Sequence, residues 1–317
     1  MRPADGRTGG SPGAAGDASD IRRGDWIDRH IPPAAQPYFR LARIDRPIGI
    51  WLLMFPCWWS TALASSGWPD PWFLLLFALG ATVMRGAGCT LNDIADRDFD
   101  ARVARTATRP IASGAIGVRQ ALVFMAALAA AGLVVLLQFN SFTIALGAAS
   151  LLLVAFYPFA KRITDWPQAV LGLTFNWGAL VGWTAVRGDL DWAPLCLYAA
   201  GLAWTLGYDT IYAHQDKEDD AIVGVRSTAL RLGAATRPWL VGFYAAATAL
   251  LALAGALAGL GPAFWPMLAL VAVHFAWQTA RLDIDDPKRC LALFKSNAHA
   301  GLLIFLAILL GRVLSPT

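Results

Sequence analysis

Hydrophobic residues along the chain form long continuous runs separated by polar stretches. Each run has about 20 residues, the length of a helix that crosses a hydrocarbon core about 30 Å thick. Runs such as LVFMAALAAAGLVVLL show none of the alternation that a membrane-spanning β-barrel requires. The pattern therefore predicts an all-α, polytopic membrane protein with nine spans, over residues 47–66, 72–91, 117–139, 141–159, 166–186, 192–211, 238–258, 263–280 and 298–314.

The connections between these runs predict which residues share one side of the membrane. Short turns at 67–70 and 259–262 alternate with longer polar loops, which span 92–116, 160–165, 212–237 and 281–297. Of the 26 Lys and Arg residues, 23 lie in the N-terminal segment, in the polar loops or at the helix edges beside them. Arg85 lies deep within a span, and only Arg187 and Arg312 fall on the short-turn side. Because cytoplasmic loops carry an excess of Lys and Arg, we expect the N-terminus and the polar loops to be cytoplasmic.

Composition supports this assignment and limits the function classes. Hydrophobic residues make up 57% of the 317 residues and charged residues 15%, against about 45–50% and about 25% in soluble proteins. The net charge of +4 follows from the bias between the two membrane sides, so it does not indicate nucleic-acid binding. The four cysteines form no CxxC pair, so neither a zinc knuckle nor a disulfide framework is supported.

The N-terminal segment differs in composition from the rest of the chain. Residues 1–30 are rich in Gly, Ala, Arg and Asp and contain no apolar core, so they do not resemble a signal peptide. Their aspartates also argue against a transit peptide. We expect a disordered cytosolic tail over 1–39 and a nine-helix membrane domain over 40–317.

Aspartates are concentrated in two clusters. Of the 22 acidic residues, all but Glu218 are aspartate. The first cluster, NDIADRDFD at 92–100, follows the second span directly. If the helix continues at about 100° per residue, Asp98 points away, whereas one face of about 100° holds Asn92, Asp93, Asp96 and Asp100.

The second cluster, YDTIYAHQDKEDD at 208–220, follows the sixth span on the same side of the membrane. There Asp209, Asp216 and Asp220 lie within about 40° of one another if the helix continues. Two acidic helix ends four spans apart indicate a weak repeat of a four-helix unit. Because clustered carboxylates near a membrane need compensation and hard cations prefer oxygen ligands, the clusters predict a magnesium ion that bridges aspartate and a substrate diphosphate. A solvated acidic loop is the alternative.

Basic residues lie where they could contact such a diphosphate. Arg85 precedes Asn92 by seven residues, which puts it on the same helix face, within about 20° and roughly 10 Å deeper in the membrane. It would bind either the substrate or a cluster aspartate. Further candidates are Arg43, Arg46, Lys161 and Arg162 at the edges of spans, and Arg109 in the loop after the first cluster. For these, the general excess of positive charge on one side of the membrane is an equally good explanation.

Six segments between residues 43 and 302 form a recognisable set of motifs. They are RIDRPIG at 43–49, MRGAGCTLNDIADRDFD at 84–100, TRPIASGAI at 108–116, YPFAKRIT at 157–164, YDTIYAHQDKEDD at 208–220 and FKSNAHAGL at 294–302. With these motifs the chain resembles the UbiA superfamily of intramembrane aromatic prenyltransferases, and most closely its bacterial members that act on 4-hydroxybenzoate in ubiquinone biosynthesis. The resemblance covers about residues 40–314.

The resemblance implies nine helices around a central cavity, which is capped by the cytoplasmic polar loops and open laterally to lipid. It implies Mg²⁺ as the cofactor. The expected metal ligands are Asn92, Asp93, Asp96, Asp100, Asp216 and Asp220. The candidate substrate-binding residues are Arg43, Arg46, Arg85, Arg97, Arg109, Tyr157, Lys161, Arg162 and Asn176, of which Asn176 would either line the cavity or bridge two helices.

The expected reaction transfers a polyprenyl group from polyprenyl diphosphate to the ring carbon ortho to the hydroxyl of 4-hydroxybenzoate. A dry cavity with aromatic walls would protect the allylic cation from water. Asp209 or Asp216 would accept a proton or polarise the phenol, and Arg162 or Arg85 would bind the acceptor carboxylate. The protein is expected in a bacterial inner membrane, in contact with lipid and without a nucleic-acid partner, and the sequence does not indicate whether other ubiquinone-pathway enzymes associate with it.

Three other functions share some of these features. A transporter would hold its ionisable residues near the bilayer midplane, whereas here they gather at one face. A CDP-alcohol phosphotransferase would have Asp-Gly and Ala-Arg pairs in its acidic motif, whereas this chain has ADRDFD at 95–100. Superfamily members with other aromatic acceptors share the aspartate motifs, but YPFAKR, YDTIYAHQD and FNWG favour hydroxybenzoate.

Overall fold

The computed structural model describes residues 19, 21, 24–103 and 105–315, and the regular elements within these residues are helices. In chain order they are α2 (Trp26–His30), α3 (Gln36–Leu41), α4 (Ile48–Ala64), α5 (Pro71–Asp100), α6 (Val118–Leu136), α7 (Ser141–Ile163), α8 (Pro167–Asn176), α9 (Gly178–Arg187), α10 (Trp192–Ala213), α11 (Lys217–Val223), α12 (Thr228–Leu232), η1 (Gly233–Ala235), α13 (Thr236–Leu257), α14 (Phe264–Arg281), α15 (Pro287–Lys295) and α16 (Asn297–Val313). The expected all-α fold is confirmed.

Each of the nine predicted spans coincides with helical structure. The second and fourth spans run beyond their predicted ends, to Asp100 and Ile163, and the fifth is broken at Trp177 into α8 and α9. The count of nine is approximate, because six helical segments of the described chain meet the length and apolarity needed to cross a membrane. They are Pro71–Asp100, Val118–Leu136, Ser141–Ile163, Pro167–Arg187, Thr228–Leu257 and Pro287–Val313, and α4 is a shorter apolar helix.

Capping side chains explain where several helices begin and end. Asp70 accepts a hydrogen bond from the amide of Trp72, and Asn140 accepts one from the amide of Thr143. These bonds satisfy amides that have no partner inside the first helical turn. Gly188 ends α9 with a left-handed backbone, φ 77°, which costs little for a residue without a Cβ.

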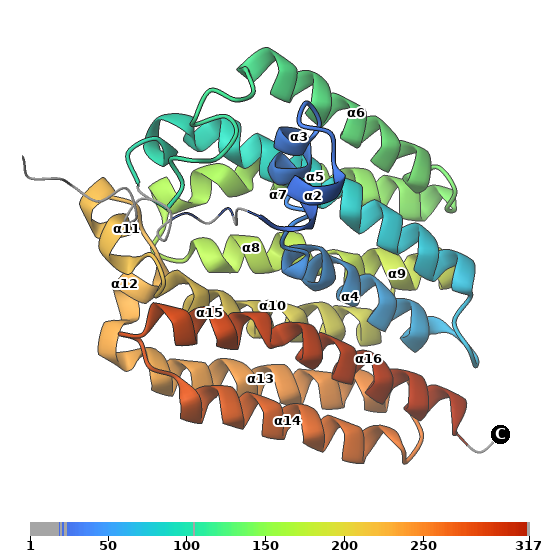
Figure 1. Ribbon diagram of the computed structural model, residues 1–317. Helices are drawn as coiled ribbons and strands as arrows, with labels where there is room; N and C mark the ends of the chain where they lie inside the picture. Colours follow the sequence, from blue (N-terminus) through green and yellow to red (C-terminus); the bar gives the residue numbers. More distant parts are fainter. Residues whose placement is uncertain (1–18, 20, 22–23, 104, 316–317) are drawn as a thin grey trace, which may run out of the picture.

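The long helices lie side by side with roughly aligned axes (Figure 1). Helix α4 packs against α9 and α16, and α10 packs against α8 and α13. Small residues permit the close crossings: a Cβ added to Gly182 of α9 would lie 2.4 Å from the carbonyl oxygen of Cys57 in α4. Large buried side chains, among them Trp59, Trp204 and Phe264, fill the main core between α4, α10 and the C-terminal helices.

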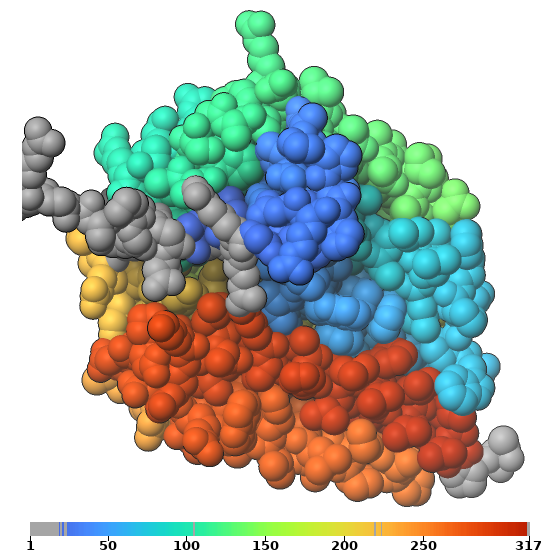
Figure 2. Space-filling model, viewed as in Figure 1, coloured from blue at the N-terminus to red at the C-terminus, as the bar shows by residue number. Residues whose placement is uncertain are grey.

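The outer surface of the bundle carries many apolar side chains. Val123 and Val134 of α6 and Leu152 of α7 are each more than 60% exposed. In Figure 2, α13–α16 (orange to red) form one side of the visible face, the segments from α5 to α7 (cyan to green) form the other, and N-terminal segments (blue) lie between them. Exposed apolar side chains of this kind suit a lipid environment.

Helices α2 and α3 lie in the region where a disordered tail was expected up to residue 39. Residues 1–18, 20, 22 and 23 of that tail lie outside the described residues. Helix α2 begins after Asp25, whose carboxylate accepts hydrogen bonds from the amides of Ile27 and Asp28, and Ile27 and Leu41 are fully buried. The described part of the tail thus contains helices and is anchored before residue 40, which differs from the expected boundary.

Candidate active site

A cavity of about 650 Å³ is lined by residues of both acidic clusters. Its acidic and amide wall residues are Asn92, Asp93, Asp96, Asp100, Gln168, Asp209, Asp216 and Asp220. Along α5 the wall residues run from Leu76 to Asp100, a distance of roughly 35 Å on a helix. The wall is therefore apolar near the start of α5, where Phe77, Val135 and Phe139 join it, and charged at the end of that helix.

The first acidic cluster lies on the uninterrupted end of α5, as the sequence pattern predicts. Asp93, Asp96 and Asp100 are buried, whereas the side chain of Asp98 is 77% exposed. Asn92 lines the cavity with the buried aspartates. The acidic helix face expected from the spacing is confirmed.

Two of these aspartates are paired with arginines from other segments. Arg43 donates from Nη2 to both carboxylate oxygens of Asp93, at 2.8 and 2.9 Å. Arg109 donates from Nη1 to Asp100 at 2.9 Å and lies 3.4 Å from Asp93. The arginine that precedes the first span and the one that follows the first cluster thus meet at the carboxylate of Asp93.

Asp96 has a different environment from the other two buried aspartates. Lys161, near the end of α7, donates to its Oδ2, and Arg162 Nη2 lies 3.6 Å from its Oδ1. Oδ1 is buried and has no hydrogen-bond partner among the described residues. Asp96 therefore presents a carboxylate oxygen that can take a further ligand.

The second acidic cluster is not one continuous helix, which corrects the expected 40° face. Helix α10 ends at Ala213 and α11 begins at Lys217, with a turn between them. Asp209 belongs to α10, whereas Asp216 is the residue just before α11 and Asp220 lies inside it. All three aspartates nevertheless line the cavity.

Two arginines that the sequence did not single out connect the segments around the cavity. Arg105 Nη2 lies 2.6 Å from Asp216 Oδ2, so the loop after the first cluster is tied to the second cluster. The backbone amide of Arg226 donates to the carbonyl of Lys161 at 3.0 Å, and Arg226 lines the cavity. The one sequence signal for Arg105 was its spacing of four residues from Arg109. A spacing of four puts two residues on the same face only in a helix, and both of these residues lie in a loop.

Arg85 lines the cavity deeper along α5, on the face where its spacing puts it. Its guanidinium lies over the ring of Phe175, 5.3 Å from the centroid, and its Nε is buried without a hydrogen-bond partner in the described part of the chain. An ion pair with a cluster aspartate, the alternative considered above, is not among the described contacts. Tyr157 and Asp209 line the same cavity.

Asn176 does not line the cavity, which corrects its expected role in substrate binding. It is buried, and its Nδ2 donates to the carbonyl of Gly172 and to Oγ1 of Thr205 at 2.8 Å each. A polar side chain inside an apolar bundle needs such partners. Asn176 therefore links α8 to α10.

Arg97 and Arg162 also lie outside the cavity wall. Arg97 has a half-exposed side chain, 3.4 Å from Asp98 on the outer face of α5. The guanidinium of Arg162 lies 5.2 Å from the ring centroid of Phe99, and Nη2 donates to the carbonyl of Ala95. Arg162 thus approaches the site through its 3.6 Å contact with Asp96 and its position over Phe99, which lines the cavity.

Aromatic rings form part of the wall near the second cluster. Tyr208 and Tyr212 of α10 and Phe294 of α15 line the cavity. The rings of Tyr212 and Phe294 lie 4.4 Å apart between centroids. The expected reaction required aromatic walls in general terms, without naming residues, and Phe294 reaches this place from a distant segment.

The carboxylate and amide oxygens at the cavity are suitable ligands for a divalent cation whose remaining ligands come from an anionic substrate. Within the described residues, no group of three His, Cys, Asp or Glu side chains converges closely enough to hold a metal alone. Magnesium usually takes one or two carboxylates and completes its shell with water and phosphate oxygens. The buried Oδ1 of Asp96 and the neighbouring Asn92 supply ligands of that type.

The turn between α10 and α11 is held by polar contacts outside the spans. His214 is buried, and its Nε2 lies 2.8 Å from Oγ1 of Thr236. Burial, and secondarily the charge of Lys217, lowers the pKa of His214 to about 4, although Asp285 opposes this shift. Lys217 Nζ donates to the carbonyl of Ile284 and to Asp285, which lowers the pKa of that carboxyl.

The sequence profile of the UbiA prenyltransferase family matches residues 53–309 of the chain. A rat protein named 4-hydroxybenzoate polyprenyltransferase, mitochondrial, is 50% identical, over 97% of this chain and 86% of its own. The human protein of that name is 51% identical, over 89% of this chain and 77% of its own. The Aedes aegypti protein of that name is 51% identical, and the match spans 64% of its length.

Solved structures show the same fold. A UbiA homolog from Aeropyrum pernix K1 superposes with a TM-score of 0.67 at 26% identity, over 83% of this chain and 97% of its own. A UbiA homolog from Archaeoglobus fulgidus, bound to GPP and Mg²⁺, superposes with a TM-score of 0.64 at 18% identity, over 86% of this chain and 99% of its own. The second likeness concerns the fold alone.

The expected bacterial inner membrane is wrong according to these comparisons. The rat, human, mosquito and Arabidopsis thaliana relatives are all named as mitochondrial proteins of eukaryotes. The bias of Lys and Arg between loops distinguishes the two sides of a membrane but does not identify the membrane. The expectation of a cytoplasmic polar face depended on the same assignment and is withdrawn with it.

Proposed function

The chain belongs to the UbiA prenyltransferase family, and we propose that it transfers a polyprenyl group from polyprenyl diphosphate to the ring carbon ortho to the hydroxyl of 4-hydroxybenzoate. The products would be 3-polyprenyl-4-hydroxybenzoate, a ubiquinone precursor, and diphosphate. Relatives that are 50% and 51% identical in sequence are named 4-hydroxybenzoate polyprenyltransferase. The observation that carries the proposal is a single cavity with two aspartate clusters and several cations at one end and apolar walls at the other.

The charged end of the cavity would hold the donor diphosphate. We propose Mg²⁺ as the cofactor, and its ligands would be drawn from Asn92, Asp96, Asp100, Asp216 and Asp220. Bound Mg²⁺ neutralises charge on the diphosphate and so improves it as a leaving group. Cations that now contact the aspartates, among them Arg43, Arg105, Arg109 and Lys161, would bind the remaining phosphate oxygens.

The apolar part of the cavity would hold the prenyl chain and protect the reacting carbon from water. The allylic C–O bond breaks with its electron pair on the diphosphate oxygen, which leaves positive charge on the prenyl carbon. The faces of nearby aromatic rings attract such a charge. Phe175, Tyr208, Tyr212 and Phe294 line the cavity and would serve in this role.

Two residues are proposed to act on the acceptor. Arg85 would bind the carboxylate of 4-hydroxybenzoate, because it lines the cavity and keeps a buried Nε without a hydrogen bond in the described structure. Asp209 would take the proton that the ring carbon loses when the new C–C bond forms. Asp216 is a weaker candidate for this step, because it is paired with Arg105. Arg162 is a weaker candidate for the carboxylate, because it lies outside the cavity wall.

The membrane is proposed to be mitochondrial, by analogy with the named relatives. The polar loops of the protein would lie on the side that carries the aspartate clusters. The exposed apolar faces of α6 and α7 would contact lipid, which supplies a long prenyl donor by lateral diffusion.

Prenyl transfer by membranes that contain the protein tests the proposal. With 4-hydroxybenzoate, a long polyprenyl diphosphate and Mg²⁺, we expect prenylated product, which EDTA abolishes. Asp96→Asn should lower the rate by about 100-fold or more, because it removes charge at the donor end. Asp98→Asn is the matched control, since Asp98 is exposed on the opposite helix face.

The outcomes of this experiment separate the levels of the proposal. Turnover with another aromatic acceptor, but not with 4-hydroxybenzoate, would reject the acceptor and retain the prenyl transfer. No turnover with any acceptor would reject the enzymatic function and favour a transporter. Equal activity of Asp96→Asn and Asp98→Asn would reject the assigned donor site.

A further inference from the structure

The turn that joins α3 to α4 places an arginine in a strained backbone conformation. Arg43 has a φ of 60° and is the only non-glycine residue with positive φ among those described. This conformation is unfavourable for a residue with a Cβ and persists only where surrounding contacts maintain it. The contacts around Arg43 therefore need an explanation.

The strained backbone brings the Arg43 side chain into the charged end of the cavity. The guanidinium is buried, and Nη2 donates to both oxygens of Asp93. Its Nη1 is buried as well and has no hydrogen-bond partner among the described residues, although Arg43 belongs to the cavity wall. A guanidinium with an unused donor at a cavity fits a phosphate oxygen.

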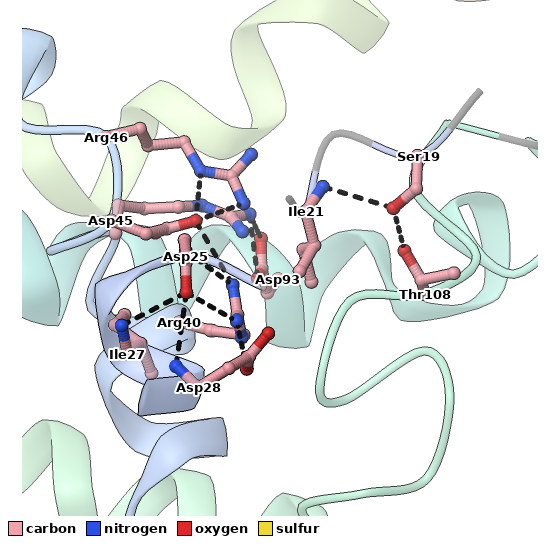
Figure 3. A network of polar contacts seen from close by, with 11 residues as sticks. Ser19, Ile21, Asp25, Ile27, Asp28, Arg40, Asp45, Arg46, Asp93 and Thr108 are labelled. Carbon is pink, nitrogen blue, oxygen red and sulfur yellow. Dashed lines mark hydrogen bonds and ion pairs between the residues drawn. The ribbon is translucent and has the colours of Figure 1, made fainter. Parts of the chain in front are cut away.

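The contacts that hold the turn converge on Arg40, three residues before Arg43 (Figure 3). The Arg40 guanidinium lies 3.1 Å from Asp25 Oδ1, 2.6 Å from Asp28 Oδ1 and 3.8 Å from Asp45 Oδ2. Asp25 and Asp28 cap and begin α2, whereas Asp45 follows the strained residue. One side chain thus ties α2 to the chain on both sides of Arg43.

Asp45 completes the link from Arg40 to the start of α4. Its buried carboxylate lies 3.1 Å from Arg46 Nη2, so it is shared between Arg40 and Arg46. The backbone of the turn is closed by bonds from Arg43 N to the Arg40 carbonyl and from Arg46 N to the Arg43 carbonyl, at 3.1 Å each. The charges and the backbone bonds fix the same short segment.

From this geometry we infer that Arg40 is a positioning residue of the donor site. Arg40 is not among the residues of the cavity wall, so its effect on a bound substrate would be indirect. By binding α2 and Asp45 together, it holds the α3–α4 turn so that Arg43 keeps its guanidinium at Asp93 and the donor. The inference rests on the proposed function for the identity of the donor anion, a diphosphate.

Kinetics of Arg40→Gln test this role. We expect KM for the polyprenyl diphosphate to rise about tenfold while kcat changes less than about twofold, because Arg43 loses its position and not the reacting groups. Arg40→Lys should recover only part of the affinity, since one ammonium cannot contact three carboxylates. Arg29→Gln in α2 is the control, because Arg29 is exposed and its side chain donates only to the Gly24 carbonyl among its described contacts.

A double substitution separates positioning from general stability. If Arg40 acts through Arg43, Arg40→Gln combined with Arg43→Gln has the same KM as Arg43→Gln alone. Multiplied effects on KM would overturn the inference. So would an unchanged KM with a lower kcat, which is the signature of less folded enzyme.

Binding of inorganic pyrophosphate tests the inference without prenyl transfer. Pyrophosphate with MgCl₂ should raise the Tm of the purified wild-type protein in detergent, and Arg40→Gln should lose most of that rise. A wild type that binds pyrophosphate but prenylates no acceptor would reject the proposed function and leave this inference standing. An equal rise in both proteins, or no rise in the wild type, would reject the inference.

Discussion

Single residues of the first cluster differ in their charge partners although they share one helix face. Asp93 has both oxygens on Arg43, and Asp100 is bonded to Arg109. Asp96 is paired with a lysine through one oxygen and keeps the other without a hydrogen bond in the described structure. Substitutions at Asp93 and Asp96 should therefore separate folding from chemistry.

Asp93→Asn should lower the stability of the protein more than Asp96→Asn does. Removing one partner of a buried ion pair costs about 3–5 kcal/mol, because the other charge stays buried without compensation. Arg43 is such a charge, with a side chain only 9% exposed, whereas Lys161 is 30% exposed and remains partly hydrated. Thermal unfolding in detergent measures the difference, and equal Tm values would contradict it.

His214 should make the stability depend on pH in the acid range. Its pKa is lowered from 6.5 to about 4 in the folded protein, so the unfolded chain takes up a proton first as the pH falls. Stability therefore decreases from about pH 6.5 down to about pH 4. In thermal unfolding between pH 7.5 and 4.5, His214→Gln should lose less Tm than the wild type. His30→Gln, at an exposed site, serves as control, and a parallel fall of all three would refute the assignment.

Residue positions could be predicted from the sequence where a regular helix fixes them. Arg85 and Asn92 share a face because both lie on α5, and the structure places both at the cavity. Arg105 and Arg40 could not be found in this way. Their partners, Asp216 and Asp25, depend on how loops and short helices fold over the bundle.

At the scale of elements, the spans were predictable and their interruptions were not. Hydropathy identifies apolar length, so each predicted span coincides with helix in the described residues. Gly178 directly follows the break at Trp177, whereas the turn after Ala213, residues 214–216, contains no proline or glycine. Packing against neighbouring helices decides such breaks, and the second of them moved Asp216 and Asp220 off the continuous helix that the spacing assumed.

The crossing of α4 and α9 should tolerate no added methyl group. Gly182→Ala would put a Cβ 2.4 Å from the carbonyl oxygen of Cys57, and overpacking of this kind costs about 1–3 kcal/mol. The measurement is the Tm of the purified variant. Gly242→Ala in α13 is the control, because no atom lies within 4 Å of its added Cβ. A Tm for Gly182→Ala equal to that of Gly242→Ala would refute the prediction.

At the scale of the whole molecule, one cavity joins segments that lie far apart in the chain. Its wall includes residues from Arg43 to Phe294, and its lining changes from apolar to charged along α5. The sequence placed the charged end correctly, because both clusters follow spans on one side. The apolar end follows from tertiary packing, which hydropathy does not describe.

The length of this cavity should govern the use of long donors. Val154 of α7 lines the cavity, and Val154→Trp would fill part of the space for a prenyl chain. We expect kcat/KM to fall for a long polyprenyl diphosphate and to change little for a short one. Val123→Trp, at a 71% exposed position of α6 outside the wall, should leave kcat/KM unchanged for both donors. If Val154→Trp leaves kcat/KM for the long donor unchanged, the proposed position of the prenyl chain is contradicted.

The ion pairs between basic side chains and aspartates at the cavity affect how the two ligands bind. Arg43, Arg105, Arg109 and Lys161 each neutralise an aspartate of the site. A diphosphate that arrives alone must compete with those carboxylates, and a cation that arrives alone must displace the arginines and the lysine. When both arrive, the diphosphate binds the arginines and the lysine that the cation displaces, and the cation binds the carboxylates that the diphosphate leaves without partners. Each ligand should therefore increase the affinity for the other by the same factor.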